Sequence, residues 1–297
     1  MCKSADIPCA PHADELAAAA CGLIHELHFA PPVLQALHPL LCEPVMAELL
    51  PFCVLMTDAR QAGAVLRWLQ SEPSCWRQLA ACAGAACMAR ERCRRLGIPP
   101  HVFLDTMGCF PRFLRETFRR TGRWQFDRAF WTWRQTSCRL FRLGPLEFEY
   151  CRADTPIDRL LCVGAPVLKV HIPSDADLHS PALKASYGQA MALFSIPELC
   201  PHGAPQAILC RSWLLSPKIV SCLGTRSGIR RFAQDYRLCA FDPQDDSFYE
   251  WLFNGERALE RLPARTSLQR HVRALLAQAS PVGSALGIYT GSLGPKE

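Results

Sequence analysis

Two side chains that can handle protons or hydrogen bonds, His171 and Ser212, lie near the ends of two short apolar segments. The segments are VLKVHIP, residues 167–173, and AILCRSWLL, residues 207–215. An imidazole titrates near about pH 6.5, so His171 can accept the proton of an attacking ammonium group. Ser212 can donate a hydrogen bond to a thiolate or a carbonyl. Purely structural hydrogen bonds remain open as the role of both residues.

Other polar residues in this half of the chain offer weaker chemistry. Cys210 can act as an acylated nucleophile with His171 as its base, although a cysteine in an apolar strand usually belongs to the core. Tyr289 can serve as a general acid, with packing as the alternative. Glu147 and Glu149 are expected to meet water, which makes them weak candidates for a general base.

The two apolar segments have the pattern of strands that bracket one amphipathic helix. Alternation places Leu168, Val170 and Ile172 on one face of the first strand. Lys169 and His171 lie on the other face. A strand, helix and strand of this length predict parallel strands with a right-handed crossover. Ligands of such units bind beyond the carboxyl ends of the strands, where His171 and Ser212 are expected.

Composition excludes several classes of protein. Hydrophobic residues make up 49% and charged residues 20% of the 297 residues, as in ordinary globular enzymes. No apolar run reaches the ~18 residues of a membrane span, and residues 1–15 have no signal-peptide core. We therefore expect neither a membrane segment nor export.

Cysteine usage favours free thiols in a reducing cytoplasm. The 17 cysteines are odd in number, scattered, and contain no CxxC pair. Cys21, His25 and His28 come closest to a metal-binding spacing, but they fit one face of an apolar helix. No metal site is expected.

Positive charge is concentrated in residues 90–142, which hold 13 arginines. A nucleic-acid surface is one interpretation. Against it, several of these arginines end predicted helices, where the helix dipole favours cations. Nucleic acid is therefore an unfavoured partner, and an anionic small molecule remains open.

Residues 1–125 read as a helical domain that includes one helix over Pro99–Arg120, and residues 126–297 as a second domain. The second begins with a helix and a hairpin over Arg139–Tyr150, whose turn contains Gly144 and Pro145. After the bracketed helix, started by Ser180 and Pro181, RLCAFD and FYEWLF (residues 237–242 and 248–253) read as strands. Thr266 and Gln269 form a capping box for a late helix. The fold class is α+β, an all-helical domain followed by a mixed sheet with helices on its faces.

Six motifs then occur in a recognisable order: GIPP from Gly97, FRLGPLEFE from Phe141, HIP from His171, CRSWLLSP from Cys210, SGIRRF from Ser227 and LPARTSLQR from Leu262. Together they resemble a family of bacterial acyltransferases that joins a helical N-acyltransferase N-terminal domain to a C-terminal domain of GNAT N-acetyltransferase fold. The resemblance covers nearly the full chain and is strongest from Leu96 onward.

The resemblance implies acyl-coenzyme A as donor and an amine, in a small molecule or a peptide, as acceptor. In the GNAT fold two parallel strands splay apart, and the exposed backbone of one pairs with the pantetheine amides. Carried onto this chain, Val170 and Cys210 lie where the donor enters. Trp213 contacts the donor or, alternatively, belongs to the core.

Two loops are candidates for the donor pyrophosphate. The resemblance assigns residues 174–180, but SDADLHS has no glycine and two aspartates that would repel phosphate. The alternative is residues 221–231, where Arg226, Gly228 and Arg230 surround a helix start. The departure from the GNAT pattern leaves a rival function open, a non-catalytic GNAT-like binding or regulatory module.

Overall fold

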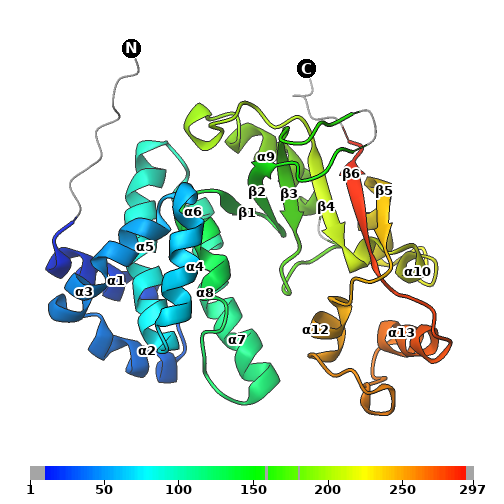
Figure 1. Ribbon diagram of the computed structural model, residues 1–297, viewed down its shortest axis with the longest axis horizontal. Coiled ribbons are helices and arrows are strands. Elements are labelled where there is room, and N and C mark those ends of the chain that lie inside the picture. Colours follow the sequence, from blue (N-terminus) through cyan, green and yellow to red (C-terminus); the bar gives the residue numbers. More distant parts are fainter. Residues whose placement is uncertain (1–10, 158–159, 180, 292–297) are drawn as a thin grey trace. The chain divides into compact units, whose positions relative to one another are not determined.

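The chain is described by a computed structural model that covers residues 11–157, 160–179 and 181–291 (Figure 1). It divides into two compact units, Met1–Phe141 and Arg142–Glu297. The division lies one helix downstream of the boundary expected after Gln125. That helix, α8 (Ala129–Thr136), packs within the first unit, where the Thr136 hydroxyl donates to the Met56 carbonyl at 2.8 Å.

The described part of the first unit is helical, as expected. Its α-helices are α1 (Ala13–Glu26), α2 (Pro31–Leu37), α3 (Glu43–Met56), α4 (Ala62–Ser71), α5 (Cys75–Arg95), α6 (Pro100–Met107), α7 (Cys109–Thr121) and α8. Ser74 caps α5, and Gly122 closes α7 in the left-handed conformation. The single helix expected over Pro99–Arg120 is wrong. The chain breaks at Gly108, which places Pro111 in the first turn of α7, where a missing N–H costs nothing.

Small side chains let α5 pack closely against α3. A Cβ added to Gly84 would lie 2.8 Å from both Cys53 Sγ and Met46 Cε.

No single helix among the described residues is long and apolar enough to cross a membrane, although Pro31–Leu40 and Glu43–Met56, bent by 92°, meet that requirement as a pair.

The second unit contains the mixed sheet. Its strands are β1 (Leu140–Leu143), β2 (Leu146–Arg152), β3 (Pro166–His171), β4 (Ile208–Ser212), β5 (Tyr236–Asp242) and β6 (Ser284–Tyr289); its α-helices are α9 (Ala182–Leu193), α10 (Pro217–Val220), α11 (Gly228–Gln234), α12 (Phe248–Phe253) and α13 (Ser267–Ala277). The strand order is β1-β2-β3-β4-β6-β5. The β3–β4 pair is parallel, whereas β2–β3, β4–β6 and β5–β6 are antiparallel. The expected α+β class is confirmed.

The strand expected for FYEWLF is wrong, because these residues form α12. Phe248 and Phe253 are buried in a cluster with Val272 of α13, and the Gln269 amide donates to the Leu252 carbonyl at 3.1 Å. This packing decides between helix and strand for a short apolar run. The capping box of Thr266 and Gln269 is confirmed.

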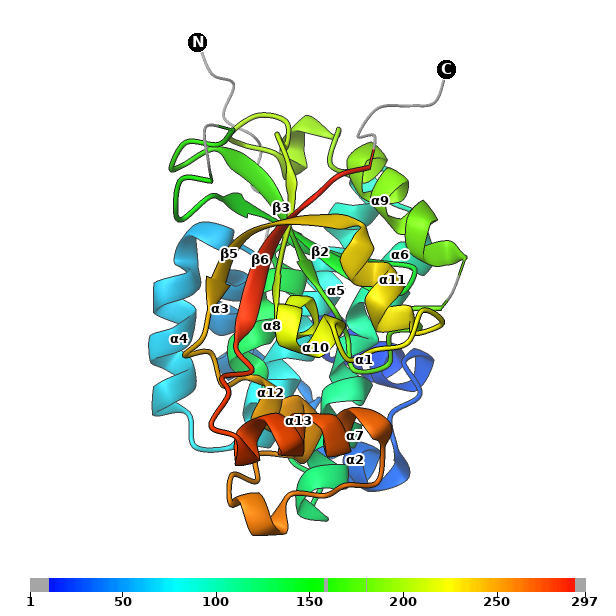
Figure 2. The ribbon, with the colours of Figure 1, turned by 90° about the vertical axis from the view of Figure 1, so that its right-hand side faces the viewer.

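One face of the sheet, the helix face, is covered by α9 and α11. The Phe148 ring meets Tyr187 of α9 edge to face at 5.8 Å between centroids, and Tyr236 packs against Phe232 of α11 at 5.0 Å. Figure 2 shows both helices on the same side of the sheet. The opposite face, the loop face, carries an apolar cluster that includes Val167, Leu209 and Leu286. Ile157 and Leu161, which lie between β2 and β3 in the chain, also belong to this cluster.

Candidate functional site

The two parallel strands lose their pairing at their carboxyl ends. The register of β3 and β4 runs from Leu168–Ile208 to Val170–Cys210. Beyond that point His171 still pairs with Glu147 of β2, and Ser212 pairs with Ala285 of β6. β3 therefore stays paired with β2, and β4 stays paired with β6, after the two strands have stopped pairing with each other. The arrows of β3 and β4 lie side by side in Figure 1. Backbone N–H and C=O groups of a strand that leaves its neighbour need another hydrogen-bond partner.

His171 stands at this opening with a carboxylate beside it. Its Nε2 lies 2.9 Å from Oε2 of Glu149, and both residues are on the loop face. The expectation that Glu147 and Glu149 meet water is wrong, because only 3% and 7% of their surfaces are exposed. The buried Glu149 carboxylate orients the imidazole ring through this contact.

The structure does not bring the other two catalytic candidates to His171. Ser212 lies on the helix face, where its Oγ accepts the N–H of Leu214 at 3.1 Å as the cap of a 3₁₀ turn over Trp213–Leu215. Tyr289 lies at the opposite end of β4, because Leu209 pairs with Ile288. Its ring stacks on Tyr187 at 4.0 Å between centroids, and burial raises the pKa of Tyr289. These contacts favour structural roles for both residues.

Cys210 and Trp213 lie in packed surroundings. Cys210 is 1% exposed, and burial raises the pKa of its thiol well above the ordinary value, which disfavours a thiolate nucleophile. Trp213 packs against the cluster formed by α12 and α13, in line with its alternative assignment to the core. Val170 faces α9 together with Cys210, its partner in the last pair of the register.

The two candidate phosphate loops meet at one place. A Cβ added to Gly228 would lie 2.8 Å from Cδ2 of His179, so the imidazole rests against the first residue of α11. One of the two aspartates is compensated, since Arg142 Nη1 binds Asp175 Oδ1 at 2.9 Å. The Asp177 carboxylate accepts the N–H of His179 at 2.9 Å. Ser180 lies outside the described residues.

The arginines of residues 221–231 have different surroundings. Arg230 Nη1 donates to the Leu223 carbonyl at 2.8 Å and thereby holds the loop before α11. Ser227 caps α11 by accepting the N–H of Arg230. Arg226 and Arg231 are exposed. The loop therefore presents cations and a helix start beside His179, an arrangement that favours an anion.

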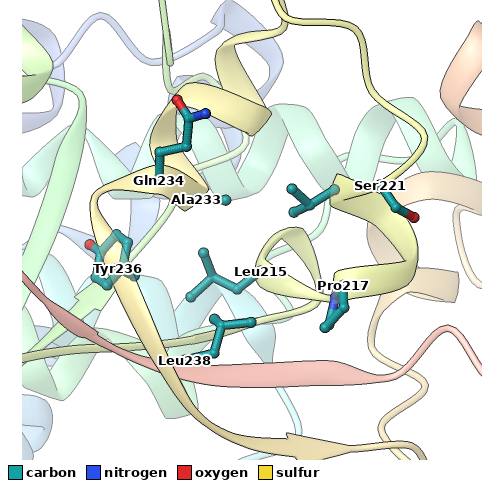
Figure 3. Close-up of a pocket in the computed structure, with 8 residues that line it drawn as sticks. Leu215, Pro217, Ser221, Ala233, Gln234, Tyr236 and Leu238 are labelled. Carbon is teal, nitrogen blue, oxygen red and sulfur yellow. The ribbon is translucent and has the colours of Figure 1, made fainter.

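A pocket of about 370 Å³ adjoins this loop on the helix face. Its lining carries no charge: Leu215, Pro217, Val220, Ser221, Ala233, Gln234, Tyr236 and Leu238. Figure 3 shows carbon atoms of Leu215, Ala233 and Leu238 facing the cavity, whereas the polar ends of Gln234 and Ser221 turn away from it. The volume falls at the lower end of the ~300–1,000 Å³ of ligand sites.

Among residues 11–157, 160–179 and 181–291, no group of three or more His, Cys, Asp or Glu side chains could hold a metal ion. The sequence did not point to two side chains of the site, His179 and Arg211, and it offered Glu149 only as a weak candidate for a general base. Glu149 and His179 depend on contacts between separate segments, for which the linear pattern carries no signal. The sequence does carry a signal for Arg211, because alternation along β4 places it on the sheet face that His171 occupies on β3.

Comparison with protein families matches both parts of the chain. Residues 23–138 match the N-acyltransferase N-terminal domain, and residues 140–289 match the GNAT-like C-terminal domain. No match to a curated protein was found.

Solved structures show the same fold over nearly the whole chain. An acyltransferase mutant in complex with octanoyl-CoA is 20% identical, with 97% of this chain and 91% of that chain covered at a TM-score of 0.75. An acyltransferase in complex with decanoyl-CoA and teicoplanin is 21% identical, with 96% and 90% covered at a TM-score of 0.73. With both domain families matched in order, the chain belongs to the N-acyltransferase family that joins a helical N-terminal domain to a GNAT-like C-terminal domain.

Proposed function

We propose that the chain transfers an acyl group from acyl-coenzyme A to an amine of a small molecule or a peptide. The amine nitrogen attacks the thioester carbonyl, a C–N bond forms, the C–S bond breaks, and the thiolate of coenzyme A leaves. The proton released by the ammonium group passes to His171. The observation that carries the proposal is the loss of β3–β4 pairing next to the His171–Glu149 pair.

Two features support His171 as the general base. It is the first residue of β3 beyond the last β3–β4 pair, so a thioester that enters the opening comes close to its ring. Glu149, at 2.9 Å, stabilises the imidazolium that forms when the ring accepts a proton. Ser212 can still donate its hydroxyl proton at the opening, whereas Tyr289 is too far along β6 to do so.

The helix face supports a site for the donor. Residues 221–231 and His179 offer a helix start and cations for the phosphates. The Arg142–Asp175 ion pair removes much of the repulsion expected from the aspartates of the shorter loop.

Calorimetry with octanoyl-CoA and octanoyl-pantetheine tests the donor assignment. We expect octanoyl-CoA to bind at least about tenfold more tightly, because only this compound has phosphates to pair with cations. Absence of octanoyl-CoA binding up to about 1 mM would favour the rival function, a non-catalytic GNAT-like module. Equal affinity of the two compounds would show that the protein makes no favourable contact with the phosphates of the donor.

The uncharged pocket on the helix face is our candidate for the acyl chain. Gly287, whose Cβ position lies 3.2 Å from the Leu215 Cδ1 that lines the pocket, pairs with Cys210 of the opening. Adjacent strands such as β6 and β4 lie about 4.8 Å apart, so an acyl chain of medium length can extend from the opening to the pocket. The acyl chains of the similar solved structures, octanoyl and decanoyl, agree with this length.

Filling the pocket should shorten the accepted chain. For Ala233→Leu we expect kcat/KM with decanoyl-CoA to fall about tenfold and that with acetyl-CoA to change less than about twofold, because overpacking excludes only the longer chain. The exposed Ala192→Leu on α9 is the matched control. An equal loss with both donors would show that the pocket does not hold the acyl chain.

The proposal includes a reducing cytoplasm as the location of the reaction. Its support is the odd number and scattered spacing of the cysteines.

A further inference from the structure

One row of side chains on the loop face crosses the opening between β3 and β4. On β3, His171 is one residue past the last β3–β4 pair, and on β4 Arg211 is one residue past the same pair. Alternation places both on the face that carries Lys169 and Leu209. The opening is therefore flanked by an imidazole on one strand and a guanidinium on the other.

The guanidinium of Arg211 is exposed and makes no hydrogen bond or ion pair with the residues that the structure describes. The charge of Arg211 acts on the carboxylate of Asp245, in the segment after β5. Burial alone would raise the pKa of Asp245, but hydrogen bonds from Ser247 and Ser284, together with the charge of Arg211, hold that pKa below its usual value. Both carboxylate oxygens are engaged, one by the Ser247 N–H at 2.8 Å and the other by the Ser284 hydroxyl at 2.7 Å. The donor fork of Arg211 remains available to another anion.

We propose that Arg211 determines acceptor specificity, and that the acceptor is an amine that also carries a carboxylate. The inference rests on the proposed function, which places the reacting amine at His171. An acceptor whose amine meets His171 extends its other end across the opening toward β4. A carboxylate there forms the bidentate pair that a guanidinium favours.

The charges nearest the opening agree with this assignment. Lys169, one register pair further along the same face, is neutralised by an ion pair with Asp154. On the β2 and β3 side the row carries Glu147 and the Glu149–His171 pair, which favour the ammonium end of the acceptor. On the β4 side it carries Arg211, followed by the apolar Leu286 of β6. The candidate phosphate loops belong to the helix face, so the donor phosphates do not compete for Arg211.

A matched pair of amines tests the proposal. With octanoyl-CoA as donor, chromatography of the N-octanoyl products gives kcat and KM for 4-aminobutanoate and for 4-aminobutanamide, which differ only in the carboxylate. We expect the wild type to favour the carboxylate by about tenfold or more, through KM, as for a charge-assisted pair. Arg211→Gln should reduce the ratio to about one, mainly by raising KM for 4-aminobutanoate. Arg211→Lys should keep part of the preference.

Exposed Arg265→Gln, on the segment before α13, is the control and should retain the wild-type ratio. An unchanged preference of Arg211→Gln for the carboxylate over the amide would overturn the proposal. An equal fall of kcat with both amines would also overturn it, because it would indicate a role of Arg211 at the thioester carbonyl. Failure of the wild type to acylate either amine while it binds octanoyl-CoA would also overturn it. Failure to bind octanoyl-CoA would instead contradict the proposed function.

Discussion

Replacement of His171 by alanine should lower kcat about 10²- to 10⁴-fold, the usual contribution of a general base. The ring is the imidazole at the opening of β3 and β4, and Glu149 holds it at 2.9 Å. The measurement is the steady-state rate of acyl transfer, with the melting temperature followed in parallel. A large fall in melting temperature would instead support a structural role for His171.

A second variant separates catalysis from packing. His171→Gln keeps a hydrogen-bond donor for Glu149 but cannot accept a proton, so it should fold normally and lose as much activity as His171→Ala. The steady-state rate of acyl transfer and the melting temperature of His171→Gln are the measurements. Retention of full activity by His171→Gln would rule out His171 as the general base.

Replacement of Gly283 by alanine should destabilise the second unit by about 2–4 kcal/mol. Gly283 has a φ of +63° just before β6, and an added Cβ would lie 2.5 Å from the Asp242 carbonyl oxygen and 2.7 Å from the Phe241 ring. A left-handed conformation and a backbone clash act together, so relaxation of side chains cannot relieve the strain. Urea unfolding monitored by circular dichroism measures the change.

Gly188→Ala is the matched control, because Gly188 is exposed within α9 and its Cβ position has no atom within 4 Å. Alanine in a helix interior should stabilise the unit by about 0.5–1 kcal/mol. A loss for Gly283→Ala no larger than about 0.5 kcal/mol would show that the chain adjusts at β6.

Local chemistry in the sequence determines many element boundaries. Thr266 and Gln269 cap α13, Ser227 caps α11, and Gly122 ends α7, because each motif satisfies helix-end groups within a few residues. Alternation also placed His171 and Lys169 on one face of β3. The family followed from motifs in order along the chain, which required no knowledge of contacts.

Elements whose state depends on distant partners were predicted less well. The run FYEWLF has no decisive period, and its helix forms because Phe248 and Phe253 pack against α13. The break between α6 and α7 was missed because Pro111 is compatible with helix once the chain restarts at Cys109.

By itself, the sequence determined the fold class, the family and the two strands that flank the opening, because these depend on local periodicity, caps and ordered motifs. Only the tertiary structure decided which side chains meet there. Strand register places His171 beside Glu149 and across the opening from Arg211, and it places Ser212 and Tyr289 elsewhere. Burial of Glu149, which alternation alone assigned to solvent, depends on what covers that face of the sheet, and such long-range contacts leave no mark on the local pattern.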